Sequence, residues 1–162
     1  DRDIRGGEKV WDHIKKGTPF RCEIGPRDLA SGSLMLGRRD DPSHKKTKLT
    51  QEELVSNIVP YLDEMHEVLY SRAKAYFQSR VKKIDSLEDF EAFFTQKDSS
   101  KLGFAYVHWH QDSAGHPLLQ KLKVTPRCIS LGEDELSGKF EEGTCLFTGK
   151  ESRQRVFFAK AY

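Results

Sequence analysis

Residues 16–29 read KGTPFRCEIGPRDL and hold the signals for a helix end, a strand and a second helical turn. The Lys-Gly pair at 16–17 is typical of a helix C-terminus, and the Thr-Pro pair at 18–19 favours an extended chain. Apolar and charged side chains then alternate, which predicts a strand over 19–24 with one buried face. Gly25-Pro26 ends this strand, because proline suits the first position of a helix. The apolar positions of the predicted strand are Phe20, Cys22 and Ile24.

The bulk composition of the 162 residues is that of a globular protein, with 36% hydrophobic and 32% charged side chains. No stretch approaches the ~20 apolar residues that span a bilayer, so we expect no membrane contact. Three scattered cysteines are too few for a disulfide scaffold, which indicates the reducing cytoplasm. The net charge of +2 means that any RNA affinity requires a local basic patch.

Hydrophobic periodicity predicts further elements in the first half of the chain. Thr50 and Glu53 have the form of a capping box that opens a long helix. We expect Pro60 to kink or restart this helix, which then continues to about residue 83. The other predicted elements are a helix over 8–16, a strand over 33–37 and an exposed loop over 40–48.

The second half of the chain is predicted to mix short helices and strands. Ser86 with Asp89 caps a helix that carries Phe90, Phe93 and Phe94. The further predicted elements are strands over 103–109, 127–131 and 155–161, a helix over 117–123 and an acidic loop over 132–143. This mixture gives an α/β or α+β class, in which the helix near 60–82 joins two units.

The quoted stretch and the end of the chain together resemble prolyl-tRNA synthetases of the archaeal/eukaryote-like type. In that family, a Lys-Gly-x-Pro-x-Arg-x-Glu-x-Gly-Pro-Arg/Lys-Asp segment follows an Asp-Arg-Asp stretch like the one at 1–3, and chains commonly stop at Ala-Lys-Ala-Tyr, as at 159–162. LYSRA at 69–73 and TPRCI at 125–129 fall where the family has a long helix and a strand. The resemblance is collinear over nearly the whole chain and does not include the family's catalytic core.

The resemblance implies an α/β fold of two parts. Residues 1–73 would be the C-terminal half of an anticodon-binding domain, a mixed sheet with flanking helices whose first strands are missing here. The long helix would join it to a small α/β C-terminal domain over 74–162. The implied function is to hold the anticodon stem-loop of proline tRNA, tRNA(Pro), while the catalytic domain of the parent chain activates proline with ATP and Mg²⁺.

The resemblance also implies what these 162 residues lack. We expect no catalytic residue and no cofactor in them, and a parent enzyme that forms a homodimer through its catalytic core. Two other interpretations stay open. In the first, the chain is a stand-alone RNA-binding paralogue without a synthetase core. In the second, it is a structural module, retained because Tyr162 and its carboxylate pack towards a catalytic domain.

The candidate RNA-binding residues follow from how guanine is recognised, since proline anticodons end in two guanines. The Watson–Crick edge of guanine offers N–H donors that suit a carboxylate, and its other edge offers acceptors that suit Arg or Lys. The family commonly places a glutamate two residues before the Lys-Gly pair, where this chain has Ile14. Asp12 or Glu23 is then the alternative acceptor. The full candidate set is Trp11, Asp12, Arg21, Glu23, Arg27, Arg38, Arg39 and Lys46.

Four of these candidates have a simpler alternative explanation. Trp11 either stacks on a base or packs beside Ile14. Arg21 and Glu23 either contact RNA or pair with each other across the surface. Lys46 corresponds to a lysine that contacts RNA in the family, although a solvated charge run is the usual meaning of such a loop.

Catalytic and metal sites are not expected. His108, His110 and Asp112 are interpreted as a strand end that enters a polar loop, in preference to an acid–base group. The family often holds zinc with four cysteines, but the corresponding positions here are Trp109, Ala114, Cys145 and Thr148. His108, His110 and His116 are possible substitute ligands. A remnant of two ligands does not supply the ~10–16 kcal/mol of a full structural site, so we predict no zinc and a core role for Trp109.

Overall fold

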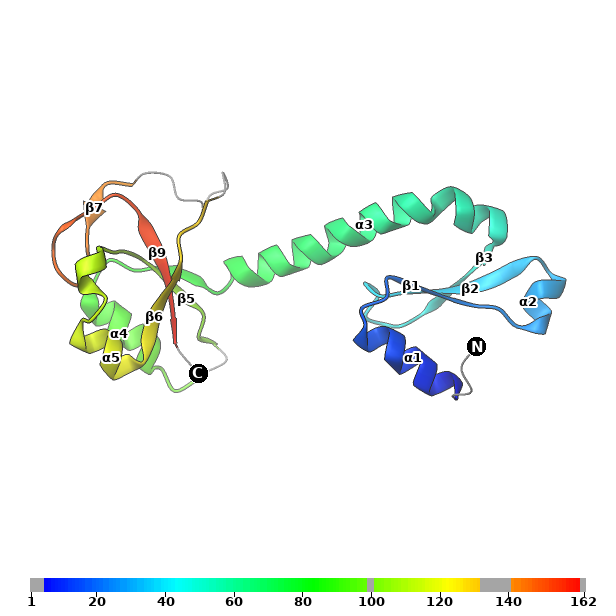
Figure 1. Ribbon diagram of the computed structural model, residues 1–162, viewed down its shortest axis with the longest axis horizontal. Helices are drawn as coiled ribbons and strands as arrows, with labels where there is room; N and C mark the ends of the chain where they lie inside the picture. The colour runs from blue at the N-terminus through cyan, green and yellow to red at the C-terminus, as the bar shows by residue number, and fades with distance from the viewer. Residues whose placement is uncertain (1–4, 99–100, 132–140, 161–162) are drawn as a thin grey trace. The chain divides into compact units, whose positions relative to one another are not determined.

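The computed structural model describes residues 5–98, 101–131 and 141–160 (Figure 1). It divides into two compact units, Asp1–Ala75 and Tyr76–Tyr162. The division lies two residues after the boundary expected for the two family domains. The Asp-Arg-Asp stretch at 1–3, most of the predicted acidic loop and Tyr162 lie outside the described residues.

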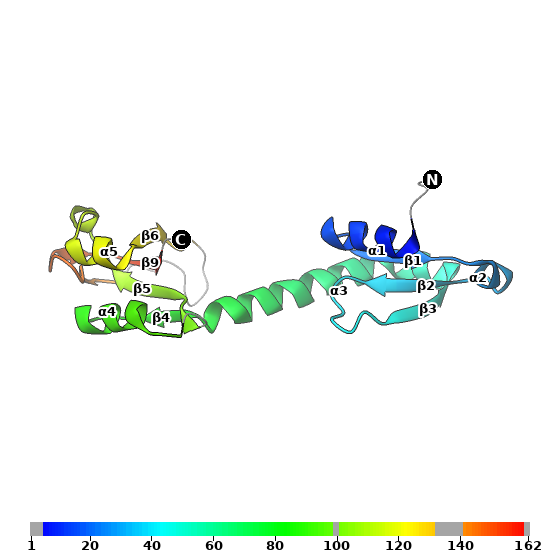
Figure 2. The same cartoon turned by 90° about the horizontal axis from the view of Figure 1, so that it is seen from below.

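The first unit is built on a three-stranded antiparallel sheet in the order β1-β2-β3 (Figure 2). Leu34 and Leu36 of the central strand and Met65 of the long helix are buried and form the apolar centre of this unit. The capping box at Thr50 and Glu53 is confirmed by reciprocal hydrogen bonds of 2.7 and 3.1 Å. The strands are β1 (Phe20–Glu23), β2 (Ser33–Arg38) and β3 (Lys46–Thr50), and the helices are α1 (Gly6–Lys15), α2 (Pro26–Ala30) and α3 (Gln51–Gln78).

Two predictions about the first unit are wrong. The segment expected as an exposed loop over 40–48 contains the start of β3, because its lysines and threonines alternate along an edge strand that pairs with β2. Cys22 and Ile24 were expected to be buried but are exposed, Ile24 by 52%. Arg21 and Glu23 lie on the face that β1 presents towards α1, and their side chains are the half-buried ones.

The long helix also differs from its prediction. α3 is one helix from Gln51 to Gln78, so it does not restart at Pro60. Pro60 lies on the exposed side, where the carbonyl that loses its helical partner is able to bond to water. The helix ends before residue 83 because Val81–Lys83 form β4 and pair with β5.

The second unit contains a four-stranded sheet in the order β4-β5-β9-β6, in which β4 and β5 are parallel and the other pairs antiparallel. Residues 151–152 and 143–144 form a short second ribbon. The strands are β4 (Val81–Lys83), β5 (Phe104–His108), β6 (Val124–Cys128), β7 (Gly143–Thr144), β8 (Glu151–Ser152) and β9 (Arg155–Lys160), and the helices are α4 (Leu87–Thr95), η2 (Gln111–Ser113) and α5 (Pro117–Leu122).

Most predictions for the second unit are confirmed. Ser86 caps α4 by accepting a hydrogen bond from the Asp89 N–H at 3.1 Å, and α5 and β9 lie where they were expected. β6 begins at Val124, three residues early, and has an irregularity between Pro126 and Cys128 where proline cannot donate to the ladder. Among the described residues, no helix combines the length and apolar character needed to cross a membrane.

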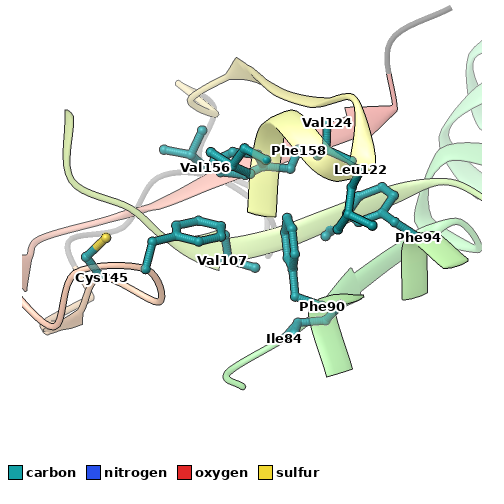
Figure 3. Packing of buried hydrophobic residues seen from close by; sticks show 12 residues of the cluster. Ile84, Phe90, Phe94, Val107, Leu122, Val124, Cys145, Val156 and Phe158 are labelled. Carbon is teal, nitrogen blue, oxygen red and sulfur yellow. The ribbon is translucent and has the colours of Figure 1, made fainter. Parts of the chain in front are cut away.

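An aromatic core holds the second unit together (Figure 3). Phe90 of α4 is fully buried and meets Phe94, Phe147 and Phe158 edge to face, with ring centroids 4.9, 5.2 and 5.8 Å apart. Such edge-to-face pairs add to the free energy gained by burial alone. α4 therefore binds the sheet chiefly through this one ring and its neighbours.

Phe90→Ala should lower the free energy of unfolding of the second unit by about 3–5 kcal/mol, because it removes a fully buried ring and leaves a cavity. Urea unfolding followed by circular dichroism measures the change. Leu87→Ala on the same helix is the matched control, since Leu87 is 40% exposed and should cost far less. Equal effects of the two variants would contradict this account of the core.

Arg155, the first residue of β9, is a buried cation. The Arg155 side chain is 5% exposed, and its Nε donates to Glu141 Oε2 at 3.0 Å while Nη2 lies 2.6 Å from Asp85 Oδ1. Lys83 Nζ donates to Glu141 Oε1 at 2.8 Å. Hydrogen bonds from Arg155 and Lys83 lower the pKa of Glu141 to about 2. Because an unpaired buried charge is costly, the guanidinium depends on these carboxylates.

Glu141→Gln should destabilise the protein at pH 7, and the difference from wild type should vanish in acid. A carboxylate whose folded-state pKa is depressed contributes stability above its unfolded pKa, near 4.5, and loses it as the pH falls towards 2. Thermal unfolding at several pH values between 2.5 and 7 measures this. A difference that stays constant over that range would show that Glu141 does not act through its charge.

Candidate nucleic-acid interface

The helix α1 is positioned by the turn that opens the quoted stretch. Gly17 adopts a φ of +70°, and its N–H donates to the Ile14 carbonyl at 3.0 Å while the Thr18 N–H donates to the His13 carbonyl at 3.1 Å. A glycine with positive φ is the usual way to end a helix and reverse the chain. The turn therefore brings α1 back beside β1, as both views show (Figures 1 and 2).

A hollow of about 540 Å³ lies between α1 and the sheet. Its size is that of a small-ligand site. Gly6 and Gly7 leave its rim open, since a Cβ at either position would meet no atom within 4 Å. The lining residues are Gly6, Gly7, Lys9, Val10 and His13 from α1, Arg21, Cys22 and Glu23 from β1, and Lys46 from β3.

Gly37 creates the space on the sheet side of this hollow. It lies in register between Arg21 of β1 and Lys46 of β3, so the three residues form one cross-strand row. The Arg21 guanidinium lies over the glycine, because a Cβ built at Gly37 would be 3.3 Å from Arg21 Nη2. A larger residue at this position would displace the guanidinium.

The charged groups of the hollow are arranged as an ion pair and a cation. Lys46 Nζ lies 2.6 Å from Glu23 Oε2, and the two side chains are 41% and 43% exposed. The partner of Glu23 is thus Lys46, in contrast to the predicted alternative of pairing with Arg21. Arg21 Nη1 is buried and has no hydrogen-bond partner within the described part of the chain. A buried donor without a partner favours an acceptor from a ligand.

Three further arginines of the candidate set lie outside the hollow. Arg38 forms two hydrogen bonds to Asp40, at 3.0 and 2.8 Å, and a third to Glu64 at 2.8 Å. The same guanidinium lies 5.6 Å from the Tyr61 ring centroid, so Arg38 fastens α3 to the sheet. Arg39 is exposed beside Gly17, and Arg27 is exposed on α2.

The remaining two candidates lie on α1. Asp12 accepts a hydrogen bond from Lys16 at 2.7 Å and is not among the residues that line the hollow. Trp11 is 65% exposed, which leaves its ring face open for stacking. Ile14 beside it is 39% exposed, so packing between them covers neither fully.

The sequence reasoning missed His13, Lys9 and Gly37 as parts of the hollow. Lys9 and His13 are four residues apart on the predicted helix, so helical spacing placed them on one face. Gly37 had no sequence signal beyond its position at the end of a predicted strand. Its role depends on which strands flank it, and β3 was not predicted.

The histidines of the second unit are separate structural groups. The His108 ring is buried, with Nδ1 3.3 Å from Ser152 Oγ, and burial lowers its pKa. His110 accepts a hydrogen bond from the Asp112 N–H at 3.3 Å. Asp112 in turn pairs with Lys150, and this lysine lowers the pKa of the carboxyl.

The positions that correspond to the family's zinc ligands do not fit a metal. Cys145 is buried 3.6 Å from Ser113 Oγ, and Trp109 packs against Phe158 with centroids 6.4 Å apart. Across the described residues, no three His, Cys, Asp or Glu side chains are placed to share a metal ion. Trp109 therefore has the core position predicted for it, although its buried Nε1 has no hydrogen-bond partner among these residues.

Protein purified without chelator should contain clearly less than one zinc per chain, because a single buried thiol cannot hold the metal alone. Elemental analysis after dialysis against metal-free buffer measures this. The control is a variant carrying Trp109→Cys, Ala114→Cys and Thr148→Cys, which restores four thiols. One retained zinc per wild-type chain would show that histidines complete a site.

Comparison with known proteins identifies what the chain is similar to. Residues 1–60 match the family model of the anticodon binding domain. The whole chain is 43% identical to part of the proline–tRNA ligase of Bdellovibrio bacteriovorus and 39% identical to that of Rhodopirellula baltica. It spans 32% and 31% of these relatives, about a third of their length.

The solved structures agree in fold. The crystal structure of prolyl-tRNA synthetase from Cryptosporidium parvum, complexed with halofuginone and AMPPNP, matches 98% of this chain with a TM-score of 0.73 at 23% identity. This chain covers 31% of that structure. The α/β fold expected from the sequence is thereby confirmed.

Proposed function

We propose that the chain is the anticodon-binding and C-terminal part of a prolyl-tRNA synthetase and holds the anticodon stem-loop of tRNA(Pro). The observation that carries the proposal is the position of the hollow. All of its lining residues lie between Gly6 and Lys46, within the segment that matches the anticodon binding domain. The rest of the chain continues the similarity to proline–tRNA ligases to its last residue.

The chemistry of the hollow supports this function. Single-stranded anticodon bases are recognised through their exposed edges and by stacking on aromatic rings. The hollow offers a carboxylate, an unpartnered guanidinium nitrogen and a lysine, and Trp11 is exposed on the same helix that lines it. Arg27, Arg39 and Lys48 are exposed cations of the same unit that are able to contact phosphates.

The activity of the parent protein follows as part of the proposal. A catalytic core elsewhere in the longer chain would activate proline with ATP and Mg²⁺, would transfer it to the tRNA and would form the homodimer in the cytoplasm. Residues 1–73 and 74–162 would be the second half of the anticodon-binding domain and the C-terminal domain. The motifs at 16–29 and 159–162 favour the archaeal/eukaryote-like type.

Two rival functions make different predictions for the gene. A stand-alone RNA-binding paralogue would have no class II synthetase core upstream of Asp1. A purely structural module would have the core but would show no loss of tRNA binding when the hollow is altered.

In the full-length enzyme, Arg21→Ala should weaken tRNA(Pro) binding and lower its salt dependence by about 0.7 in the slope of log K against log salt concentration, since it removes one cation from a single-stranded site. Lys46→Ala should also weaken binding but change the slope by less, because Glu23 already offsets the charge of Lys46. Filter binding at several salt concentrations measures both effects. Proline-dependent pyrophosphate exchange should stay unchanged, because it needs no anticodon contact.

Lys82→Ala is the matched control, since Lys82 is an exposed lysine of the second unit. It should bind tRNA(Pro) like wild type. The proposed function would be contradicted by a full-length enzyme whose tRNA affinity is the same for all three variants and wild type.

A further inference from the structure

We propose that an exposed apolar side of α3 binds a helix from the part of the same polypeptide that lies upstream of Asp1. This inference rests on the proposed function, because it requires the longer chain of a synthetase. The chain spans 32% of the relative from Bdellovibrio bacteriovorus, so about two thirds of such a parent protein lies outside the 162 residues.

One apolar side of α3 is covered within the first unit, and a second apolar side next to it is not. Met65, on the covered side, is 4% exposed. Val55, Val59 and Leu62 are 75%, 62% and 41% exposed. Because residues three or four positions apart share one side of a helix, these three side chains form a continuous exposed row.

Two aromatic rings continue this row at four-residue steps. The rings of His66 and Tyr70 stack with an interplanar angle of 3° and centroids 6.5 Å apart, and Tyr70 is 55% exposed. From Val55 to Tyr70 the row extends over ~22 Å of helix. The α3 row consists of Val55, Val59, Leu62, His66 and Tyr70.

The spacing of the α3 row favours a helix as its occupant. Its steps of four, three, four and four residues are close to the 3.5-residue repeat with which helices pack side by side. A strand is a poorer occupant, since its backbone groups need hydrogen-bond partners and those inside α3 are already used. An exposed apolar row of this length is typical of a surface that another protein segment covers.

Carboxylates along one flank of the α3 row indicate the chemistry of that helix. Glu52 lies three residues before Val55, and Asp63 lies four residues after Val59. Glu67 follows Asp63 by four residues. Within the part of the chain that the structure describes, these three exposed carboxylates have no ion pair. The bound helix should therefore carry lysine or arginine beside its apolar face.

The same carboxylates disfavour other occupants. RNA phosphates would be repelled by them. Two copies of α3 packed antiparallel would bring Asp63 and Glu67 near the same residues of the other copy, because the middle of the row lies near residue 62, and like charges so placed are destabilising. A helix of the same polypeptide has the further advantage of a high effective concentration.

Thiol labelling of the full-length enzyme tests whether the row is covered. The thiol of Val59→Cys should react with N-ethylmaleimide about tenfold or more slowly than that of Ser71→Cys, since a packed side chain reacts only when its contact opens. Ser71 is the matched control, because it is exposed on another side of the same helix. Peptide mass spectrometry measures each rate, and far-UV circular dichroism like that of wild type shows that both variants are folded.

Carbodiimide crosslinking of the wild-type full-length enzyme identifies the occupant. Asp63 or Glu67 should become joined to a lysine upstream of Asp1, and Asp63→Asn combined with Glu67→Gln should abolish that crosslink. In enzyme assembled from mixed ¹⁵N-labelled and unlabelled chains, each crosslinked pair should carry a single label pattern, as expected for one polypeptide.

Three results would overturn the inference. The first is equal reactivity at positions 59 and 71. The second is crosslinks that join different chains or only residues within 1–162, and the third is the absence of any crosslink from these carboxylates. The proposed function fails separately, when the gene has no synthetase core upstream or the enzyme does not bind tRNA(Pro). Retained tRNA(Pro) binding together with a reactive position 59 would reject only the docking of a helix on α3.

Discussion

The polar face of the first unit depends on the row in which Gly37 of β2 lies between Arg21 of β1 and Lys46 of β3. Side chains on neighbouring strands of one face normally compete for the same volume, since opposed Cβ atoms are ~5 Å apart. A glycine in the central strand removes that competition. Arg21 is then able to lie across the sheet, and Lys46 is able to reach Glu23 on the far edge strand. The charge distribution of the hollow follows from this one missing side chain.

In the second unit, backbone hydrogen bonds, an ion pair and aromatic packing hold the loop that contains Cys145. The turn at Cys145 is fixed by the Cys145 N–H bond to the Lys150 carbonyl at 2.7 Å and by the ion pair of Lys150 with Asp112. The ring of Phe147 packs on Phe90 and Phe158 behind the turn. These contacts fix the loop through side chains and backbone groups of the second unit alone.

Sequence reasoning succeeded where the signal was local. The capping boxes at Thr50 and Ser86 and the aromatic spacing of α4 each depend on residues within one or two turns, and all were confirmed. It failed where the outcome depended on a distant partner. Periodicity correctly predicted which side chains of β1 share a face. It wrongly predicted that the apolar face is buried, because only the tertiary structure decides whether a face is covered. The lysine-rich β3 was missed because its strand character comes from pairing with β2.

The candidate site depends both on local sequence signals and on partners distant in the sequence. The charged types at Arg21, Glu23 and Lys46 were visible in the sequence, but their mutual arrangement needed the register of three strands. In the proposed function that arrangement matters for RNA binding, because a net charge of +2 provides little general attraction. A lysine already neutralised by Glu23 displaces fewer counterions from RNA phosphates, so the pair adds less affinity than two isolated cations would. It adds direction instead, since Lys46 biases the orientation of the Glu23 carboxylate within the hollow. In the proposed function, the ion pair therefore contributes the orientation of its side chains more than non-specific affinity.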